Sequence, residues 1–87
     1  MTYALRFSAQ ARKAINKLDR YAAKVIMAWI YKNLMDCENP RSKGKRLVGD
    51  HSGEWRYRVG DYRIIVDIQD TELTVLVVAI GHRKSVY

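Results

Sequence analysis

The segment Trp55–Val66, WRYRVGDYRIIV, constrains the fold of this chain more than any other, because its pattern predicts a β-hairpin of fixed register. Two runs of alternating polar and apolar residues flank Gly60-Asp61, and a glycine-led two-residue loop between such runs is typical of a type I′ or II′ turn. Such a turn sets the cross-strand partners, since the side-chain period of a strand is two. The expected pairs are Val59 with Tyr62, Arg58 with Arg63, Tyr57 with Ile64, and Arg56 with Ile65.

This register places three arginines, Arg56, Arg58 and Arg63, on one face of the hairpin. Arg58 and Arg63 lie directly opposite each other, and like charges in such a pair destabilise a sheet by some tenths of a kcal/mol. We therefore expect these arginines to bind an anion. A phosphate is the best candidate for that anion. The other face is the predicted core, with Trp55, Tyr57, Val59, Tyr62, Ile64 and Val66.

The charge of the chain agrees with an anionic partner. Its 87 residues carry 16 Lys and Arg against 9 Asp and Glu, a net charge of +7, and such a balance favours nucleic acid. An anionic membrane or an acidic protein would also suit it. With 48% apolar residues the chain is just large enough for one hydrophobic core. We therefore expect a single domain over 1–87.

Other function classes find little support in the composition. Cys37 is the one cysteine, which excludes an internal disulfide, and one Cys with two His gives no zinc pattern. We expect no metal and no cofactor. The N-terminal residues do not resemble a signal peptide, and no apolar run approaches the roughly 18 residues of a membrane span. A cytoplasmic protein without a membrane partner is expected.

The hydrophobic pattern predicts the order β-α-α-β-β-β. The expected strands and helices are a strand at Tyr3–Phe7, a helix at Gln10–Leu18 capped by Ser8, a helix from Asp19 to Leu34, and strands at Glu54–Val59, Tyr62–Ile68 and Glu72–Ile80. The last strand is almost wholly apolar, which indicates a central place in the sheet. This order predicts an α+β fold, an antiparallel sheet with a two-helix hairpin packed on one face. The arginines would lie on the opposite face.

Between the helices and the hairpin, Pro40–Gly53 is predicted to be a polar loop. It contains the run RSKGKR, from which we select Lys43, Lys45 and Arg46 as candidate RNA contacts. A flexible, solvated charged loop is the simpler interpretation of such a run. The net charge of the chain favours the contact with a polyanion.

Most of the chain resembles the RelE/ParE superfamily of bacterial toxins, and within it the RelE branch. The resemblance rests on LVGDHSGEWRYRVGDYRIIV, from Leu47 to Val66, together with IGHRKSVY, from Ile80 to Tyr87. It implies a RelE-like, microbial-RNase-like fold and a toxin of a toxin-antitoxin pair. The implied activity is that of an mRNA interferase, a ribosome-dependent endoribonuclease that cuts mRNA in the A site by attack of the 2′-hydroxyl and so inhibits translation. The implied partners are ribosome-bound mRNA, the 16S rRNA around it, and a RelB-like antitoxin.

The resemblance also implies the site residues. The positions of the basic residues and the terminal tyrosine of RelE proteins are occupied here by Arg56, Arg58, Arg63, Arg83 and Tyr87. Apart from the resemblance, His82, beside Arg83, is a further candidate RNA contact. We expect two departures from RelE proteins: arginines replace the lysines of the best-known members on the first hairpin strand, and the chain stops at Tyr87 without a C-terminal helix.

These residues do not identify the general base that removes the proton of the 2′-hydroxyl. A guanidinium with a pKa above about 12 is a poor general base near neutral pH. Lys45, Glu54 and His82 are alternatives, and positioning by the ribosome could supply much of the acceleration. The rival functions are a ParE-like, non-catalytic inhibitor of DNA gyrase and a basic RNA-binding module without catalysis.

Overall fold

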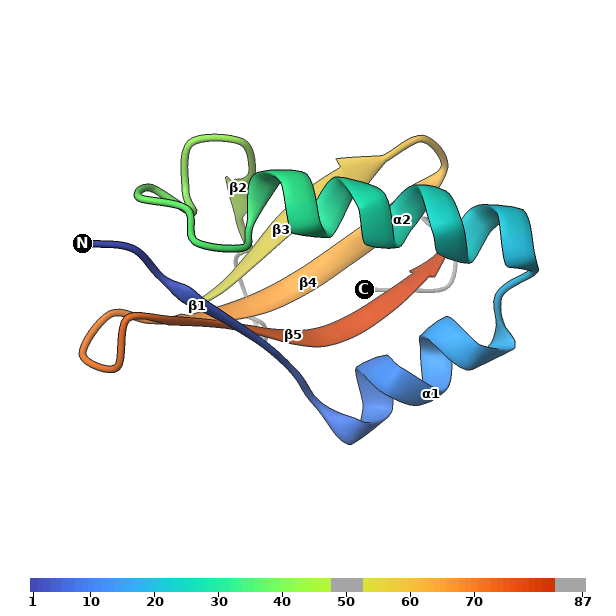
Figure 1. Cartoon of the computed structure of the whole chain (residues 1–87), viewed down its shortest axis with the longest axis horizontal. Coiled ribbons are helices and arrows are strands. Elements are labelled where there is room, and N and C mark those ends of the chain that lie inside the picture. The colour runs from blue at the N-terminus through green and yellow to red at the C-terminus, as the bar shows by residue number, and fades with distance from the viewer. Residues whose placement is uncertain (48–52, 83–87) are drawn as a thin grey trace.

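Two helices cover one face of a five-stranded mixed sheet (Figure 1). The computed structural model describes residues 1–47 and 53–82. The elements are β1 Ala4–Phe7, α1 Ala9–Lys17, α2 Arg20–Asn33, β2 Lys45–Arg46, β3 Glu54–Val59, β4 Tyr62–Gln69 and β5 Thr74–His82. The strands lie in the order β1-β5-β4-β3-β2. This confirms the predicted α+β class and the internal position of the last strand.

Both helices begin at the predicted caps. The Ser8 hydroxyl accepts from the Ala11 amide at 3.0 Å, and the Asp19 carboxylate accepts from the Ala22 amide at 2.8 Å. These side chains satisfy amides that have no partner within the first turn of a helix. Ser8 also donates to the Val78 carbonyl of β5 at 3.2 Å, so the same residue begins α1 and attaches it to the sheet.

The hairpin has the register that the sequence predicts. Arg58 is paired with Arg63, and Arg56 with Ile65. Gly60 has φ +60°, a left-handed conformation that a glycine adopts without a steric penalty. The turn residues and the alternation of the two strands therefore specified the arrangement of the arginines correctly.

Two features of the sheet differ from the expectation. β1 runs parallel to β5, so the sheet is mixed rather than wholly antiparallel. A parallel pair needs a long crossover connection, and everything between β1 and β5 supplies it. The loop over 40–53 also contains a strand, β2, whose Lys45 and Arg46 pair with Arg56 and Trp55 of β3. A strand of two residues is too short to show a hydrophobic period, so the sequence pattern could not indicate it.

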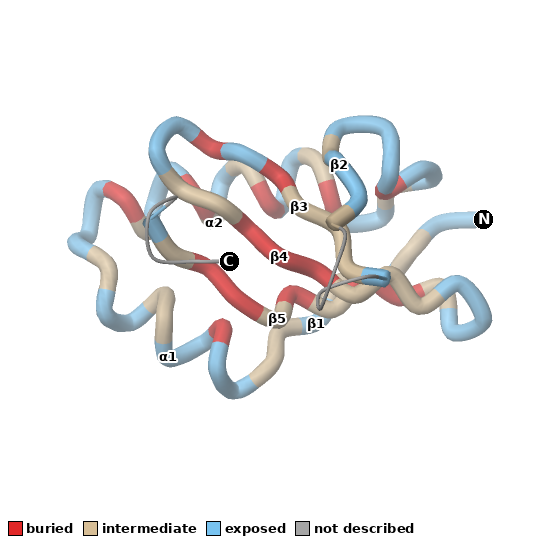
Figure 2. Tube along the Cα trace, turned by 180° about the vertical axis from the view of Figure 1, so that it is seen from behind, coloured by how far each residue is buried: buried red, intermediate tan, exposed pale blue. Residues whose placement is uncertain are grey.

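The core lies between the helices and one face of the sheet. Its members are fully or largely buried and come from α1, α2 and the three long strands, namely Ala11, Ile26, Ile30, Leu34, Tyr57, Val59, Ile64, Val66, Val75, Val77 and Ile80. A register shift beside Ile65 and Val66 leaves Val78 as an extra residue on β5, a β-bulge that turns both Val77 and Ile80 to the core. The other face of the sheet is turned to the viewer in Figure 2, with α2 behind it and α1 along the side of β5.

Candidate RNA-binding site

Three arginines lie together on the sheet face that is turned away from the helices; we call this the arginine face. Arg58 is directly opposite Arg63, and Arg56 is one row further along β3. Burial lowers the pKa of Arg56, and the charges of Arg63 and Arg58 lower it further. Ile65, the partner of Arg56, is fully buried. Arg56 therefore lies beside a buried apolar side chain, where its charge acts more strongly than in water.

The short strand β2 brings a fourth cation to this face. Lys45 is directly opposite Arg56, and directly opposed residues of antiparallel strands share a face. A pocket of about 170 Å³ forms where the two strands meet, and its lining is Lys43, Gly44, Lys45, Arg56 and Arg58. We call it the basic pocket. Four of these five residues are cationic, so the structure unites Lys43 and Lys45 with two of the predicted hairpin arginines.

Close packing holds the loop side of the basic pocket in place. A Cβ at Gly44 would lie 2.5 Å from Trp55 Cδ1 and 2.6 Å from the Arg56 carbonyl oxygen, so only glycine fits here. Lys43 donates a hydrogen bond to the Asn33 side chain at the end of α2. The Tyr57 hydroxyl, whose pKa burial raises, donates to the Pro40 carbonyl. The loop is thus attached to both the sheet and the helical layer.

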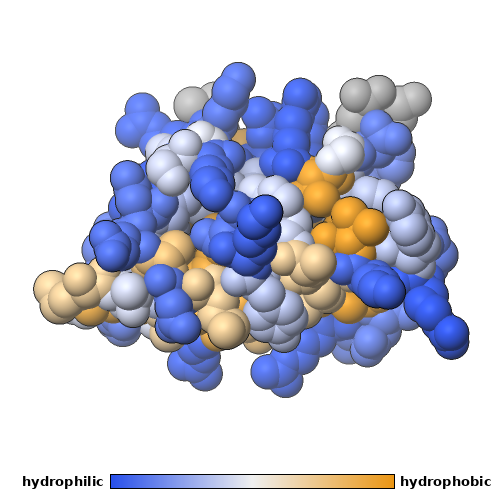
Figure 3. Space-filling model, turned by 45° about the horizontal axis from the view of Figure 1, so that its top comes forward, coloured by the Kyte–Doolittle hydropathy of each residue, from blue (hydrophilic) through white to orange (hydrophobic). Residues whose placement is uncertain are grey.

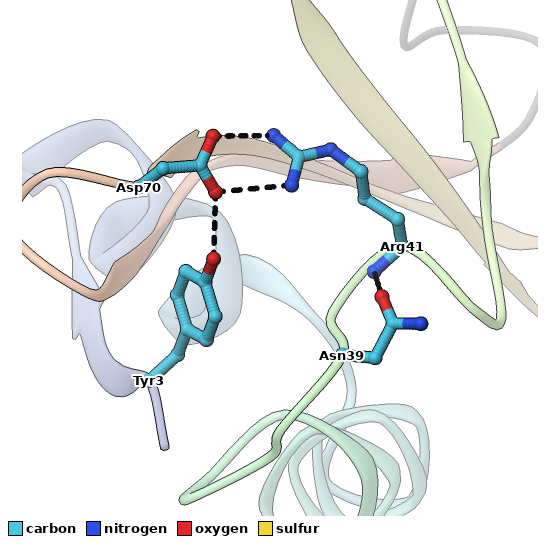
Figure 4. A network of polar contacts seen from close by, with 4 residues as sticks. All are labelled: Tyr3, Asn39, Arg41 and Asp70. Atoms are coloured by element: carbon cyan, nitrogen blue, oxygen red, sulfur yellow. Dashed lines mark hydrogen bonds and ion pairs between the residues drawn. The ribbon is translucent and has the colours of Figure 1, made fainter. Parts of the chain in front are cut away.

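A further network ties the start of this loop to the far end of the sheet (Figure 4). Asp70, in the turn between β4 and β5, accepts two hydrogen bonds from Arg41 at 3.0 and 2.9 Å and one from the Tyr3 hydroxyl at 2.6 Å. The Arg41 guanidinium and the Tyr3 hydroxyl hold the pKa of Asp70 down at about 2. No local sequence pattern predicts this network, because Asp70 is 29 residues from Arg41 and 67 residues from Tyr3.

Arg46 does not join the basic pocket. It is opposite Trp55 rather than Arg56, which places it on the other face of the sheet edge. There it lines a separate hollow of about 380 Å³ with Arg41, Gly53, Trp55 and Ile68. Lys45 and Arg46 were expected to act together as one basic run, but a strand turns successive side chains to opposite faces.

The three candidates for the general base are placed differently. Glu54 is on β3 two residues before Arg56, and therefore on the arginine face. Lys45 is on the same face. His82 is opposite Tyr62, with the two rings 5.9 Å apart edge to face, so the register directs it away from Arg63. Arg83 and Tyr87 lie outside the described residues.

Residues 1–47 and 53–82 provide neither a metal site nor a membrane-spanning helix. They contain no group of three or more His, Cys, Asp or Glu side chains arranged to hold a metal ion. In the same part of the chain, no helix combines the length and the apolar character that crossing a membrane requires.

The chain is similar to known toxins along nearly its whole length. A sequence profile of the family described as the ParE toxin of type II toxin-antitoxin systems matches residues 5–87. Toxin RelG of Mycobacterium tuberculosis is 29% identical over 87 residues, which is 100% of this chain and 98% of the relative. Toxin RelE of the same organism is 28% identical over 85 residues, 98% of this chain and 86% of the relative.

Solved structures agree with this comparison. A chain of the M. tuberculosis toxin-antitoxin complex RelBE2 matches with a TM-score of 0.85 and 28% identity, covering 95% of this chain and 93% of that one. The isolated Escherichia coli RelE toxin matches with a TM-score of 0.73 at 23% identity, covering 92% of this chain and 83% of that one. The second likeness concerns the fold alone.

Proposed function

The chain belongs to the ParE toxin family of type II toxin-antitoxin systems, and from that premise we propose that it is a ribosome-dependent endoribonuclease that cuts mRNA in the A site. The named relatives RelG and RelE favour the RelE branch over the gyrase-directed one. The observation that carries the proposal is the basic pocket beside the opposed pair Arg58 and Arg63. A cytoplasmic location follows from a ribosomal target.

The arginine face suits the charge that RNA cleavage develops. The 2′-oxygen attacks the adjacent phosphorus, a phosphorane with additional negative charge forms, and the bond to the 5′-oxygen breaks. The products are a 2′,3′-cyclic phosphate and a 5′-hydroxyl. Arg58 and Arg63 lie directly opposite each other on adjacent strands, and the planar guanidinium fork of an arginine is suited to binding phosphate oxygens. Fixed donors of this kind stabilise a transition state without reorganising.

Lys43 and Lys45 have a different role in this proposal. They line the basic pocket beside Arg56 and Arg58 and hold the neighbouring phosphate of the RNA strand, as point charges rather than forks. Removing Lys43 weakens binding and lowers its salt dependence, while the rate of the bound complex changes little.

The general base that removes the proton of the 2′-hydroxyl is expected to lie on the arginine face. Glu54 and Lys45 lie on that face, whereas the register turns His82 to the opposite one. Comparing Glu54→Gln with Lys45→Met in pH–rate profiles distinguishes the two, because only loss of the base abolishes the limb of the profile that reports its titration. The 5′-oxygen leaves as an alkoxide and takes its proton from water or from a neighbouring acid.

Arg83 and Tyr87 are added to the proposed site on the basis of the resemblance alone. Arg83 would add a further guanidinium to the phosphorane, and Tyr87 would stack on a splayed base, as aromatic side chains do with single-stranded RNA.

We also propose a RelB-like antitoxin as the second partner. Similar chains were solved in complexes with RelB proteins. α2 and the residues after it expose large apolar side chains, namely Tyr21, Val25, Tyr31 and Met35. In Figure 3 apolar surface is set among strongly hydrophilic side chains, and the net charge of +7 suits an acidic partner.

Primer extension on an mRNA held in programmed ribosomes tests the proposed activity. The parent protein should produce a cut within the A-site codon and leave the same RNA intact without ribosomes. ParE-like inhibition of DNA gyrase is the rival function. Inhibition of supercoiling in vitro, with no cut on the ribosome, would replace the nuclease by that rival function. Binding of RNA without either effect would leave only the RNA-binding module.

A further inference from the structure

We propose that the hollow lined by Arg41, Arg46, Trp55 and Ile68 is a second RNA subsite, which takes one unpaired nucleotide outside the scissile phosphate. This inference rests on the proposed function, since it supposes an RNA ligand. The hollow is larger than the basic pocket, about 380 Å³ against about 170 Å³. Its lining combines a flat aromatic ring, an apolar wall and two guanidinium groups, which together match a base with its phosphate.

The stacking surface of this subsite is Arg41. Its guanidinium lies over the Trp55 ring, 5.8 Å from the ring centroid. Both terminal nitrogens bind Asp70 in the bidentate manner, which occupies donors in the plane of the group and fixes its orientation. The side chain remains 41% exposed. A base can therefore stack on the face of the guanidinium that is turned away from the indole.

Arg46 supplies the charge for the phosphate. It is exposed, and among the described residues it has no carboxylate within ion-pairing distance. Arg41, in contrast, is already neutralised by Asp70. The two arginines of one subsite thus differ in role: one is a fixed plane and the other an unneutralised cation.

The position of the hollow connects it with the basic pocket. β2 is the edge strand of the sheet; Lys45 belongs to the basic pocket on one side of it and Arg46 to the hollow on the other. The two subsites therefore meet at consecutive residues of the chain. A single RNA strand that bends around this edge can occupy both.

The contacts of Asp70 favour RNA over an acidic protein segment. A carboxylate that entered the hollow would have to compete with Asp70 for the in-plane donors of Arg41. A base needs only the guanidinium face, which this pairing leaves free. The aromatic and planar groups would then contribute through stacking, which depends little on sequence.

The test is titration of the intact protein with hexaadenylate carrying 2′-O-methyl groups, which cannot be cut by 2′-hydroxyl attack. Indole N–H signals are followed by NMR and assigned with Trp29→Phe. The Trp55 signal should shift, while that of Trp29, which packs against Tyr57 with ring centroids 5.4 Å apart, stays in place as an internal control. Inorganic polyphosphate of equal charge should bind without the same Trp55 shift.

Three variants test whether RNA binding depends on the residues that line the hollow. Arg41→Ala should weaken binding about tenfold through the loss of stacking. Arg46→Ala should reduce the slope of log affinity against log salt by about 0.7, the contribution of one phosphate contact to a single strand. Arg20→Ala, which removes an exposed cation from the start of α2, should leave the Trp55 shift unchanged.

The proposal is overturned if the Trp55 signal does not move, if polyphosphate moves it equally, or if a glutamate-rich peptide moves it more than the RNA does. These readouts need no ribosome and no cleavage. Failure of the subsite is therefore distinguishable from failure of the proposed nuclease activity.

Discussion

At the residue scale, alternation along the hairpin explains both a success and a failure of the sequence analysis. It predicted correctly that Arg58 faces Arg63, because a two-residue turn leaves one register. It did not separate Lys45 from Arg46, because the strand that turns them to opposite faces is too short to show a pattern. Where the backbone conformation is evident from sequence, so is the side-chain direction.

Gly44→Ala is the sharpest residue-scale prediction for the basic pocket. The new methyl group would lie about 2.5 Å from Trp55 Cδ1, so the loop must move away from β3. We expect the free energy of unfolding to fall by about 1–3 kcal/mol, as for other overpacked sites, and the affinity for single-stranded RNA to fall with it. Urea denaturation and an RNA titration measure the two effects. Ser42→Ala, which removes only an exposed hydrogen bond to the Asn39 carbonyl in the same loop, is the control and should cost less, and equal stability of the two variants would contradict the close approach.

At the element scale, Ser8 joins α1 to the bulge of β5. Its hydroxyl accepts from the Ala11 amide and donates to the Val78 carbonyl. Ser8→Ala should therefore lower the free energy of unfolding by about 2 kcal/mol, whereas Asp19→Ala, which removes a cap alone, should cost about 1 kcal/mol. Ser8→Thr should restore most of the loss. If the two alanine variants cost the same in urea denaturation, the bond to the bulge contributes nothing.

The turn between β4 and β5 gives a pH-dependent prediction. Asp70 has its pKa lowered from 3.8 to about 2 by Arg41 and Tyr3. Because the pKa is depressed in the folded state, the stabilisation is present above pH 3.8 and lost as the pH falls through about 2. The melting temperature of Asp70→Asn should be below that of the parent at neutral pH, and the difference should shrink from pH 4 toward pH 2.

Asp61→Asn is the matched control for this experiment, because Asp61 is an exposed turn carboxylate without an ion pair among the described residues. Its difference from the parent should not follow the same course. A gap between Asp70→Asn and the parent that stays constant down to pH 2 would show that the carboxylate is not what holds Arg41.

At the scale of the whole molecule, the sequence predicted the layers better than the connections between distant parts. Hydrophobic periodicity indicated two helices, a hairpin and a buried last strand, and these confirm the α+β architecture. The direction of β1 and the contacts of Arg41 with Asp70 and Tyr3 depend on residues far apart in the chain. Only the assembled fold brings them together, so no local pattern could reveal them.

The central claim is that the arginine face stabilises the charge developed in mRNA cleavage, and a single-turnover rate on programmed ribosomes with saturating toxin tests it most directly. Arg63→Ala should reduce the rate constant about 100-fold, and Arg63→Lys should reduce it less, because the charge remains while the fork is lost. Arg20→Ala should cleave as the parent does. If Arg63→Ala, folded and bound to the ribosome, cuts at the parental rate, the arginine face is not the catalytic surface.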